Sequence, residues 1–386
     1  MSMCMKHLFS LLTATIYLVG ILRRDGVTGF KLADTNTLKT VLMIHRHGDR
    51  NPVTLGSLNP NKANNFPDGL GRVTLFGKQR LYGLGMLTRL RYANFLTFDP
   101  NEAYVHSSNM DRCLVSAQMV SSSIYPPRTK QLWSNDIRWQ PVPVHSLPEH
   151  YDPLTEAGNT CPRLNVERRK LEQTPEVQAI RRRMAPISSL AERDLGLEFG
   201  DWWKLGWLYA DLGAQEKSVC PTCTLPSWYN STIRNTLREV TLECFKLNTY
   251  TPLLRQLYAG PMLQELVHRI HQPLVNDSEG ISFKRKLFVY SSHDSEMTAL
   301  MNAVDIHYLE PPGFASSMFF EFHQIPRSAE PIVRLYYTPD GGPEKFCELT
   351  MGCHETNESF CNLTAFEKLV QQINPYDYVR ECFSPT

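Results

Sequence analysis

The sequence predicts an α/β fold in which a mixed central sheet, flanked by helices, carries an inserted and mostly helical cap domain. Three short apolar segments, at positions 40–44, 103–107 and 286–290, have the composition of buried strands, and helical patterns lie between and after them. Strands that alternate with helices indicate a layered α/β domain. Two later segments, 317–322 and 332–337, are predicted to pair through a turn, which adds an antiparallel edge to the sheet.

The middle of the chain differs from both flanks. Positions 142–260 contain no clear strand segment, are rich in Trp, Arg and Glu, and show helical patterns at 171–184 and 232–247. Strands followed by charged motifs lie on both sides of this stretch, so the economical interpretation is an insertion into a single domain. We therefore assign 142–260 to a helical cap, and 30–141 together with 261–386 to the α/β domain.

Residues 1–29 have the pattern of a secretory signal peptide. A short, weakly basic start precedes the apolar run Leu8–Leu22, which ends at Arg23–Asp25. The run is short for a membrane span. Cleavage is expected near Val27–Gly29, and the alternative is an uncleaved signal anchor, because a basic pair follows the apolar run. No second apolar stretch approaches spanning length, so we expect a soluble, exported product.

The cysteines and the glycosylation sequons agree with export. Ten cysteines are present and Cys4 lies in the predicted signal, so nine remain and at least one is a free thiol or bonds another chain. Cys220 and Cys223 have the C-x-x-C spacing of a redox or zinc motif, but a single pair is weak evidence, and a loop staple or separate structural bonds are favoured. Cys113 falls in a helical pattern and is expected to be a buried small hydrophobe. Exposed, glycosylated loops are expected at Asn230, Asn276, Asn357 and Asn362.

Charged residues gather directly after the three predicted strands. The loop Arg46–Arg50, with the sequence RHGDR, follows the first strand, Asp111–Arg112 follows the second, and His293–Asp294 follows the third. Ligands of open α/β sheets bind beyond the carboxyl ends of the strands, so these segments are expected to share one crevice. The formal net charge of the chain is only +1, which leaves no global field to hold nucleic acid or an anionic membrane. Any anion site therefore has to be local.

Three arginines and two histidines at this edge of the sheet predict a pocket for a phosphoryl group. Arginine matches the oxygens of phosphate with paired hydrogen bonds, and a cationic cradle stabilises the charge on the transferring group. The sequence has no Walker loop, no glycine-rich nucleotide fingerprint and no His/Asp cluster at two-metal spacing. We therefore expect no cofactor and no metal, and a nucleophile that the protein itself supplies.

His47 is the predicted nucleophile and Asp294 the predicted proton donor. A neutral imidazole attacks phosphorus and becomes a phosphohistidine, and Arg46 and Arg50 disfavour the imidazolium form of His47 by like-charge repulsion. Asp294 has to be protonated when the substrate arrives, which makes an acid optimum physically sensible.

Other polar residues near these strands have structural interpretations. His45 is expected to pack or hydrogen-bond behind His47, and His106 to be a strand residue. Asp49 is expected to orient the loop or to pair with Arg50. A single histidine after a strand is usually a loop or core residue, so the prediction for His47 depends on its charged neighbours.

These motifs resemble those of a known family. The runs Arg46–Pro52, Asp111–Arg112 and Ser292–Asp294 resemble the three motifs of the histidine acid phosphatases, which include prostatic, lysosomal and insect venom enzymes and form the eukaryotic branch of the histidine phosphatase superfamily. An Arg-His-Gly triplet alone is shared with phosphoglycerate mutases, but the heptad with the later His-Asp pair is specific. The likeness extends from about Leu38 to Cys382.

The resemblance implies a phosphoglycerate-mutase-like α/β domain with a helical cap, and it assigns roles to the motif residues. His47 would be the nucleophile and Asp294 the proton donor. Similar proteins often form homodimers, and Trp139 and His145 fall where those proteins make dimer contacts. The residues that would bind phosphate are Arg46, Arg50, Arg112 and His293.

The resemblance also bears on the cysteines. Similar proteins form two disulfides whose counterparts here would be Cys161–Cys382 and Cys353–Cys361. Ser317 stands where related proteins have a cysteine that pairs with one near Cys220, so that family disulfide is in doubt. Asn51 stands where Ser or Thr is usual, which leaves the core roles intact. The partners of four cysteines stay open, namely Cys220, Cys223, Cys244 and Cys347.

The expected function is that of an acid phosphatase acting on small phosphomonoesters, secreted after signal cleavage. A lysosomal lumen location is the alternative, and the sequence lacks the C-terminal membrane helix of the lysosomal form. Two further functions stay open: a narrower phosphatase for lysophosphatidic acid or inositol phosphates, and a non-catalytic secreted binding protein. The presence of all six expected site residues argues against the binding protein.

Overall fold

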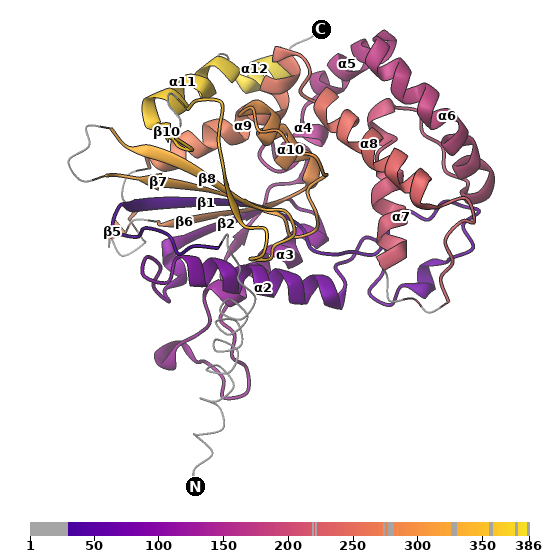
Figure 1. The fold of residues 1–386 in the computed structure, drawn as a ribbon. Helices are drawn as coiled ribbons and strands as arrows, with labels where there is room; N and C mark the ends of the chain where they lie inside the picture. The colour runs from indigo at the N-terminus through magenta and orange to yellow at the C-terminus, as the bar shows by residue number, and fades with distance from the viewer. Residues whose placement is uncertain are drawn as a thin grey trace.

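The computed structural model describes residues 30–383 apart from 218–219, 221, 273–274, 277–281, 284, 326–329, 355–357 and 375–376. The predicted signal segment 1–29 and the sequon asparagine Asn357 lie outside the described residues. Figure 1 shows a central sheet with helices on both faces and a second group of helices beside it.

The central sheet is mixed, as the sequence predicts. Its strands are β1 (Leu38–Arg46), β2 (Ala103–Ser107), β3 (Val144–His145), β6 (Leu287–Ser292), β7 (Ser317–His323), β8 (Ile332–Thr338), β9 (Cys347–Leu349) and β10 (Cys361–Asn362). The order is β10-β8-β7-β1-β6-β2-β3, and β9 also pairs with β8. The strands β1, β6, β2 and β3 pair in parallel, whereas β7 pairs antiparallel to β1 and β8. The predicted hairpin is therefore β7–β8. A separate small sheet consists of β4 (Val275–Asn276) and β5 (Ser282–Phe283).

Two layers of helices cover the sheet (Figure 1). One layer contains α2 (Leu75–Arg91) and α3 (Asp111–Ile124), and the other contains α9 (Pro252–Ile270), α10 (Asp294–Ala303), α11 (Leu363–Ile373) and α12 (Tyr378–Phe383). Side chains of β1 alternate between the two cores: Val41 and Met43 pack in the cluster with α2 and α3, and Leu42 and Ile44 pack in the cluster with α9 and α10. Burial on both faces explains why this strand is continuously apolar.

The remaining helices form the cap at one side of the sheet (Figure 1). They are α4 (Ala157–Thr160), α5 (Pro162–Lys170), α6 (Pro175–Leu195), α7 (Trp207–Lys217) and α8 (Ser231–Leu247). Cap side chains such as Trp202 and Leu208 belong to the same hydrophobic cluster as Ile44 of β1, so the cap shares a continuous core with the sheet domain. The domain boundaries at 141/142 and 260/261 stay predictions. The strand β3 follows the first boundary but pairs within the sheet, and α9 runs through Gly260 at the second.

The described part of the chain contains three disulfides. Cys161–Cys382 joins the start of α5 to α12, and Cys353–Cys361 closes a short loop before β10. The third bond joins Cys220 to Cys223, as a loop staple would. Among the described residues, the free thiols are those of Cys113 and Cys244, which are buried, and of Cys347, which is exposed. No helix in the described ranges is both long and apolar enough to cross a bilayer.

Candidate active site

The three charged segments meet where β1, β6 and β2 end, because these strands lie side by side and run in parallel. In the register of β1 and β6, Arg46 stands opposite Ser292. The backbone N–H of His47 donates to the Ser292 carbonyl at 3.1 Å. Helices α3 and α10 begin directly after two of the strands, so Arg112 and Asp294 lie in their first turns. The crevice expected from the sequence therefore collects all three motifs.

The side chain of His47 is buried and held by a backbone hydrogen bond. It is only 3% exposed, and its Nδ1 lies 3.0 Å from the Gly48 carbonyl oxygen. Because a carbonyl can only accept, Nδ1 carries the hydrogen and Nε2 keeps a lone pair. Burial, followed by the positive charges of Arg112, Arg46 and the other cations of the pocket, lowers the pKa of His47 well below its usual value. The ring is therefore neutral, with a nitrogen free to attack.

Two of the motif arginines are held by carboxylates. The Arg46 Nη2 lies 2.8 Å from Asp294 Oδ2, and its Nη1 donates to the Pro312 carbonyl at 2.6 Å. The Arg50 Nη1 donates to Asp211 Oδ1 at 2.9 Å, and Asp211 comes from α7 in the cap. These contacts fix the orientation of each guanidinium group before any ligand arrives.

Unpaired donors in the pocket indicate an anionic ligand. The Nε atoms of Arg46, Arg50 and Arg112 are buried and have no hydrogen-bond partner in the described part of the chain. The ring of Phe314 covers the Arg46 guanidinium at 4.5 Å and lies 5.7 Å from the ring of His47. Buried donors without partners are unfavourable unless a ligand or water satisfies them, so this cluster is built to receive oxygens.

His293 is the fourth cationic group of the pocket. Its ring centroid lies 5.6 Å from that of His47, and its Nε2 contacts Glu156 Oε1 at 2.7 Å and Ser108 Oγ at 3.2 Å. Burial opposes protonation of His293, but the interactions with Cys113 and Glu156 outweigh burial and raise the pKa well above its usual value. His47 and His293 thus stand close together in opposite protonation states.

Two partner carboxylates were not found from the sequence. Asp211 interrupts an otherwise apolar helical run in the cap, which is a weak signal of a buried charge. Glu156 precedes the short helix α4 in an irregular stretch, and no pattern in the sequence distinguishes it. Both lie outside the three motifs, and each contacts a basic residue that is far away in the sequence.

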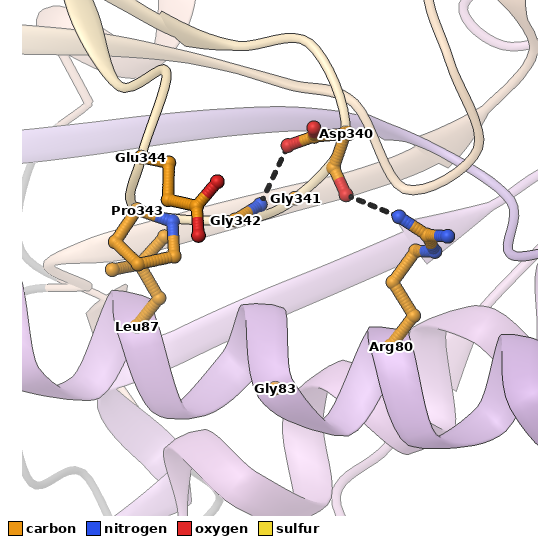
Figure 2. Close-up of a pocket in the computed structure, with 8 residues that line it drawn as sticks. All are labelled: Arg80, Gly83, Leu87, Asp340, Gly341, Gly342, Pro343 and Glu344. Carbon is orange, nitrogen blue, oxygen red and sulfur yellow. Dashed lines mark hydrogen bonds between the residues drawn. The ribbon is translucent and has the colours of Figure 1, made fainter. Parts of the chain in front are cut away.

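An ion pair with α2 holds the loop that carries His47. Asp49 pairs with Arg80 of this helix, with Nε to Oδ2 at 2.7 Å, and not with Arg50. Arg80 also donates to the Asp340 carbonyl at 3.2 Å, and the Asp340 carboxylate accepts the N–H of Gly342 (Figure 2). Arg80, Asp340 and Gly342 are among the residues that line an open pocket of about 330 Å³ between α2 and the 340–344 loop. None of the six predicted site residues lines this pocket.

The other histidines near the strands have structural contacts. His45 is buried, its Nδ1 lies 3.1 Å from the Arg46 carbonyl, and burial lowers its pKa to about 4. His106 is buried and contacts Asp152 Oδ2 through Nε2 at 2.8 Å. These contacts fit the structural interpretations of both residues.

The fold and the site together define an enzyme of phosphoryl transfer. A neutral histidine with a free nitrogen stands among arginine donors and an imidazolium, beside a carboxyl group that can carry a proton. Within the described residues, no group of three or more metal-ligating side chains is placed to hold an ion.

Comparison with known families gives the same class. The chain belongs to the histidine phosphatase superfamily (branch 2), whose sequence pattern matches residues 37–338. It is therefore a phosphatase that acts on phosphate monoesters through histidine.

Curated relatives and solved structures extend this result. The chain is 28% identical to putative acid phosphatase 5 of Caenorhabditis elegans, over 91% of this chain and 80% of that protein. It is also 28% identical to prostatic acid phosphatase of Homo sapiens (90% and 88% covered) and to venom acid phosphatase Acph-1 of Apis mellifera (88% and 86% covered). The apo phytase of Hafnia alvei has a similar fold, with a TM-score of 0.66 at 17% identity and coverage of 90% of this chain and 98% of that one.

Proposed function

We propose that the protein is an acid phosphatase that hydrolyses phosphate monoesters through a phosphohistidine on His47, with Asp294 as the proton donor. The observation that carries this proposal is the state of His47: buried, neutral and hydrogen-bonded through Nδ1, so that Nε2 is available. A histidine in this state can act as a nucleophile where an electrophile is brought to it. The arginines around it select an electrophile that carries negative charge.

Two chemical steps complete the reaction. In the first, the lone pair of His47 Nε2 forms a bond to phosphorus while the bond from phosphorus to the ester oxygen breaks. The ester oxygen takes the proton of Asp294 and leaves as the alcohol. In the second, water attacks phosphorus and gives a proton to the Asp294 carboxylate, while the phosphorus–nitrogen bond breaks. Inorganic phosphate is released, and both residues return to their starting states.

The cationic groups stabilise both transition states. The negative charge of the transferring group is spread over three non-bridging oxygens, and the buried Nε donors of Arg46, Arg50 and Arg112 are already desolvated. Contacts with the carboxyl groups of Asp294 and Asp211 orient the first two of these guanidinium groups, so little reorganisation is needed as charge develops.

Acid pH suits the protonation states that these steps need. His47 has to be neutral, and its lowered pKa keeps it so well into the acid range. Asp294 has to carry a proton when the alcohol leaves, which a lower pH favours. Activity should therefore be confined to acid pH, and at the acid limit it should fall as His47 gains a proton.

The substrates are proposed to be small phosphomonoesters of varied structure. Relatives named acid phosphatases, aligned over most of this chain, support the activity. A narrower enzyme for lysophosphatidic acid or inositol phosphates is the alternative, and the likeness to phytases, at 17% identity, is a likeness of fold. A non-catalytic binding role is disfavoured because the nucleophile and the donor are both in place.

We also propose that the protein is exported, glycosylated and able to form a homodimer. Asn230 is exposed at the start of α8, as a glycosylation site requires. The strand β3 lies at the edge of the sheet, and exposed apolar side chains, including Trp133 and Trp139, occur in the segment that leads to it. An edge strand beside exposed aromatic residues is suited to pairing with a second copy.

Turnover of p-nitrophenyl phosphate by the full chain at acid pH tests the proposed activity. We expect hydrolysis that declines toward neutral pH. A folded protein that binds inorganic phosphate but turns over no ester would favour the binding role instead. A substrate panel with alkyl, lysophospholipid and inositol phosphates then distinguishes a broad from a narrow substrate range.

A further inference from the structure

The carboxylate of Glu156 is buried against the pocket and is shared by three donors. Its Oε1 lies 2.7 Å from His293 Nε2 and also accepts from the hydroxyl of Ser108. Its Oε2 accepts from Asn159 Nδ2 at 2.9 Å. The residue is 3% exposed, so the charge has little water to stabilise it and depends on these partners. No step of the reaction proposed above uses this carboxylate.

The contact with Glu156 fixes which nitrogen of His293 is available to a ligand. An ionised carboxylate only accepts, so Nε2 carries a hydrogen. Nδ1 has no nitrogen or oxygen partner among the described residues, and its recorded contact is with the Cys113 sulfur at 3.9 Å. In a neutral ring, Nδ1 would present a lone pair, which repels the oxygens of phosphate. In the imidazolium form, Nδ1–H donates to them.

The groups around His293 favour its protonated form. Glu156 contacts Nε2 as a carboxylate. Burial opposes ionisation of Glu156, but the charge of His293 and the hydrogen bonds from His293 and Ser108 hold the pKa of Glu156 below its usual value. A second carboxyl, Glu296 of α10, also faces the ring, and burial raises its pKa to about 7. Glu296 is thus largely protonated at acid pH and supplies little charge there. The remaining neighbours are His47 after β1, and Arg112 and Cys113 of α3.

We propose that Glu156 is a positioning residue that keeps His293 an imidazolium with Nδ1–H available to a phosphate oxygen. The inference rests on the proposed function only in naming phosphate as the ligand. The carboxylate acts through His293 and does not itself touch the substrate. Its expected effect is on the pH range over which the pocket binds phosphate, more than on the chemical step.

Calorimetric binding of inorganic phosphate to the full chain between pH 4.5 and 8 tests this role. In Glu156→Gln the amide oxygen can still accept from Nε2, but the negative charge is gone. We expect affinity close to the wild type at the acid end and a midpoint shifted to lower pH by about one unit or more, so that the loss grows toward the alkaline end and reaches ~10-fold at pH values above both midpoints. Glu156→Asp, which keeps the charge, should restore much of the alkaline binding.

Glu149→Gln is the matched control. Glu149 accepts from the same Asn159 Nδ2 at 2.9 Å but has no recorded contact with His293, so its removal should leave the pH dependence unchanged. The titration of phosphate itself is common to all variants and cancels in the comparison. A loss of affinity by the same factor at every pH in Glu156→Gln, or no loss at all, would overturn the proposal.

A measurement on the unmodified protein covers the case in which the variants do not fold. In protein labelled with [¹⁵N]histidine, both ring nitrogens of His293 should carry hydrogens at pH 7, and a neutral ring there would also overturn the proposal. Neither experiment depends on turnover. A wild type that binds phosphate with the expected pH dependence but hydrolyses no ester would defeat the proposed function and leave the role of Glu156 standing.

Discussion

The ends of the central strands and the segment between β3 and α8 supply the pocket with different kinds of side chain. The strand ends bring the proposed nucleophile His47, the proposed proton donor Asp294 and the cationic groups. The later segment brings carboxylates, each of which contacts a basic group of the sheet domain. These pairs are Asp152 with His106, Glu156 with His293, and Asp211 with Arg50.

The two regions are therefore expected to have different roles in the site. Residues at the strand ends are proposed to contact the substrate, so their loss should remove chemistry at every pH. Carboxylates of the cap contact the strand-end residues, so their loss should change affinity, pH dependence or stability while chemistry continues. Asp294 is the acidic residue that belongs to the first group, because it lies in the first turn of α10 beside Arg46.

The largest effect is expected from His47→Ala. Without Nε2 no phosphoenzyme forms, and turnover of p-nitrophenyl phosphate should fall by at least ~10⁴-fold at all pH values. After reaction with ³²P-labelled substrate and quenching in alkaline detergent, the variant should carry no label, while the wild type should yield a phosphoprotein that loses its label on acid treatment. A variant that still traps label would place the nucleophile elsewhere and remove the distinction between the two regions.

Asp294→Asn should have the next largest effect, and the leaving group should determine its size. General acid catalysis contributes ~10²–10⁴-fold where the departing oxygen needs a proton. Alkyl phosphates should therefore lose most of that factor, whereas p-nitrophenyl phosphate, which has a good leaving group, should lose far less. Equal losses for both substrates would show that Asp294 serves Arg46 and not the leaving group.

The motifs at the strand ends could be predicted because they are local in sequence. A buried strand followed by Arg46-His47-Gly48 reveals both the geometry and the chemistry within a few residues. Asp211 and Glu156 could not be found in this way, because each acquires its meaning from a partner more than a hundred residues away. The pairing of Cys220 with Cys223 was likewise open, since spacing permits several partners and only the fold selects one.

Asp211→Asn should weaken substrate binding without stopping the reaction. Asp211 accepts from Arg50 and from the backbone N–H groups of Val53 and Thr54, and an amide can replace only part of this. The loss of a charge-assisted hydrogen bond costs about 2 kcal/mol, which corresponds to ~30-fold in KM. Steady-state kinetics should show the change in KM with a smaller change in kcat.

A neighbouring carboxylate on the same helix gives the control for this variant. Glu216 pairs with Arg234 at the surface, so Glu216→Gln should leave both constants within about twofold of the wild type. If Asp211→Asn lowered kcat by as much as Asp294→Asn does, the cap would take part in the chemistry itself, and the division between the two regions would fail.

The smallest effect is expected from Asp152→Asn, and it concerns stability. Burial alone would raise the pKa of Asp152, but hydrogen bonds from His106, Thr155 and the Leu154 N–H outweigh it and lower the pKa below its usual value. The carboxylate therefore stays ionised in the folded protein at the acid pH at which the enzyme is proposed to work. Removing its charge should cost about 1–3 kcal/mol at pH 5 to 7.

The pH dependence of that loss distinguishes charge from packing. A carboxyl whose pKa is lower in the folded than in the unfolded state stabilises the fold fully above the unfolded value, near ~3.9, and this contribution disappears as the pH falls through the folded value. The difference in melting temperature between Asp152→Asn and the wild type should therefore be constant at pH 5 to 7 and should shrink below about pH 4. The exposed pair of Asp68 and Lys78, 3.6 Å apart, provides Asp68→Asn as a control with a cost below about 1 kcal/mol. A difference that persisted undiminished at pH 3 would mean that Asp152 contributes through the shape of its hydrogen bonds, and that the carboxylates of the cap do not share one electrostatic role.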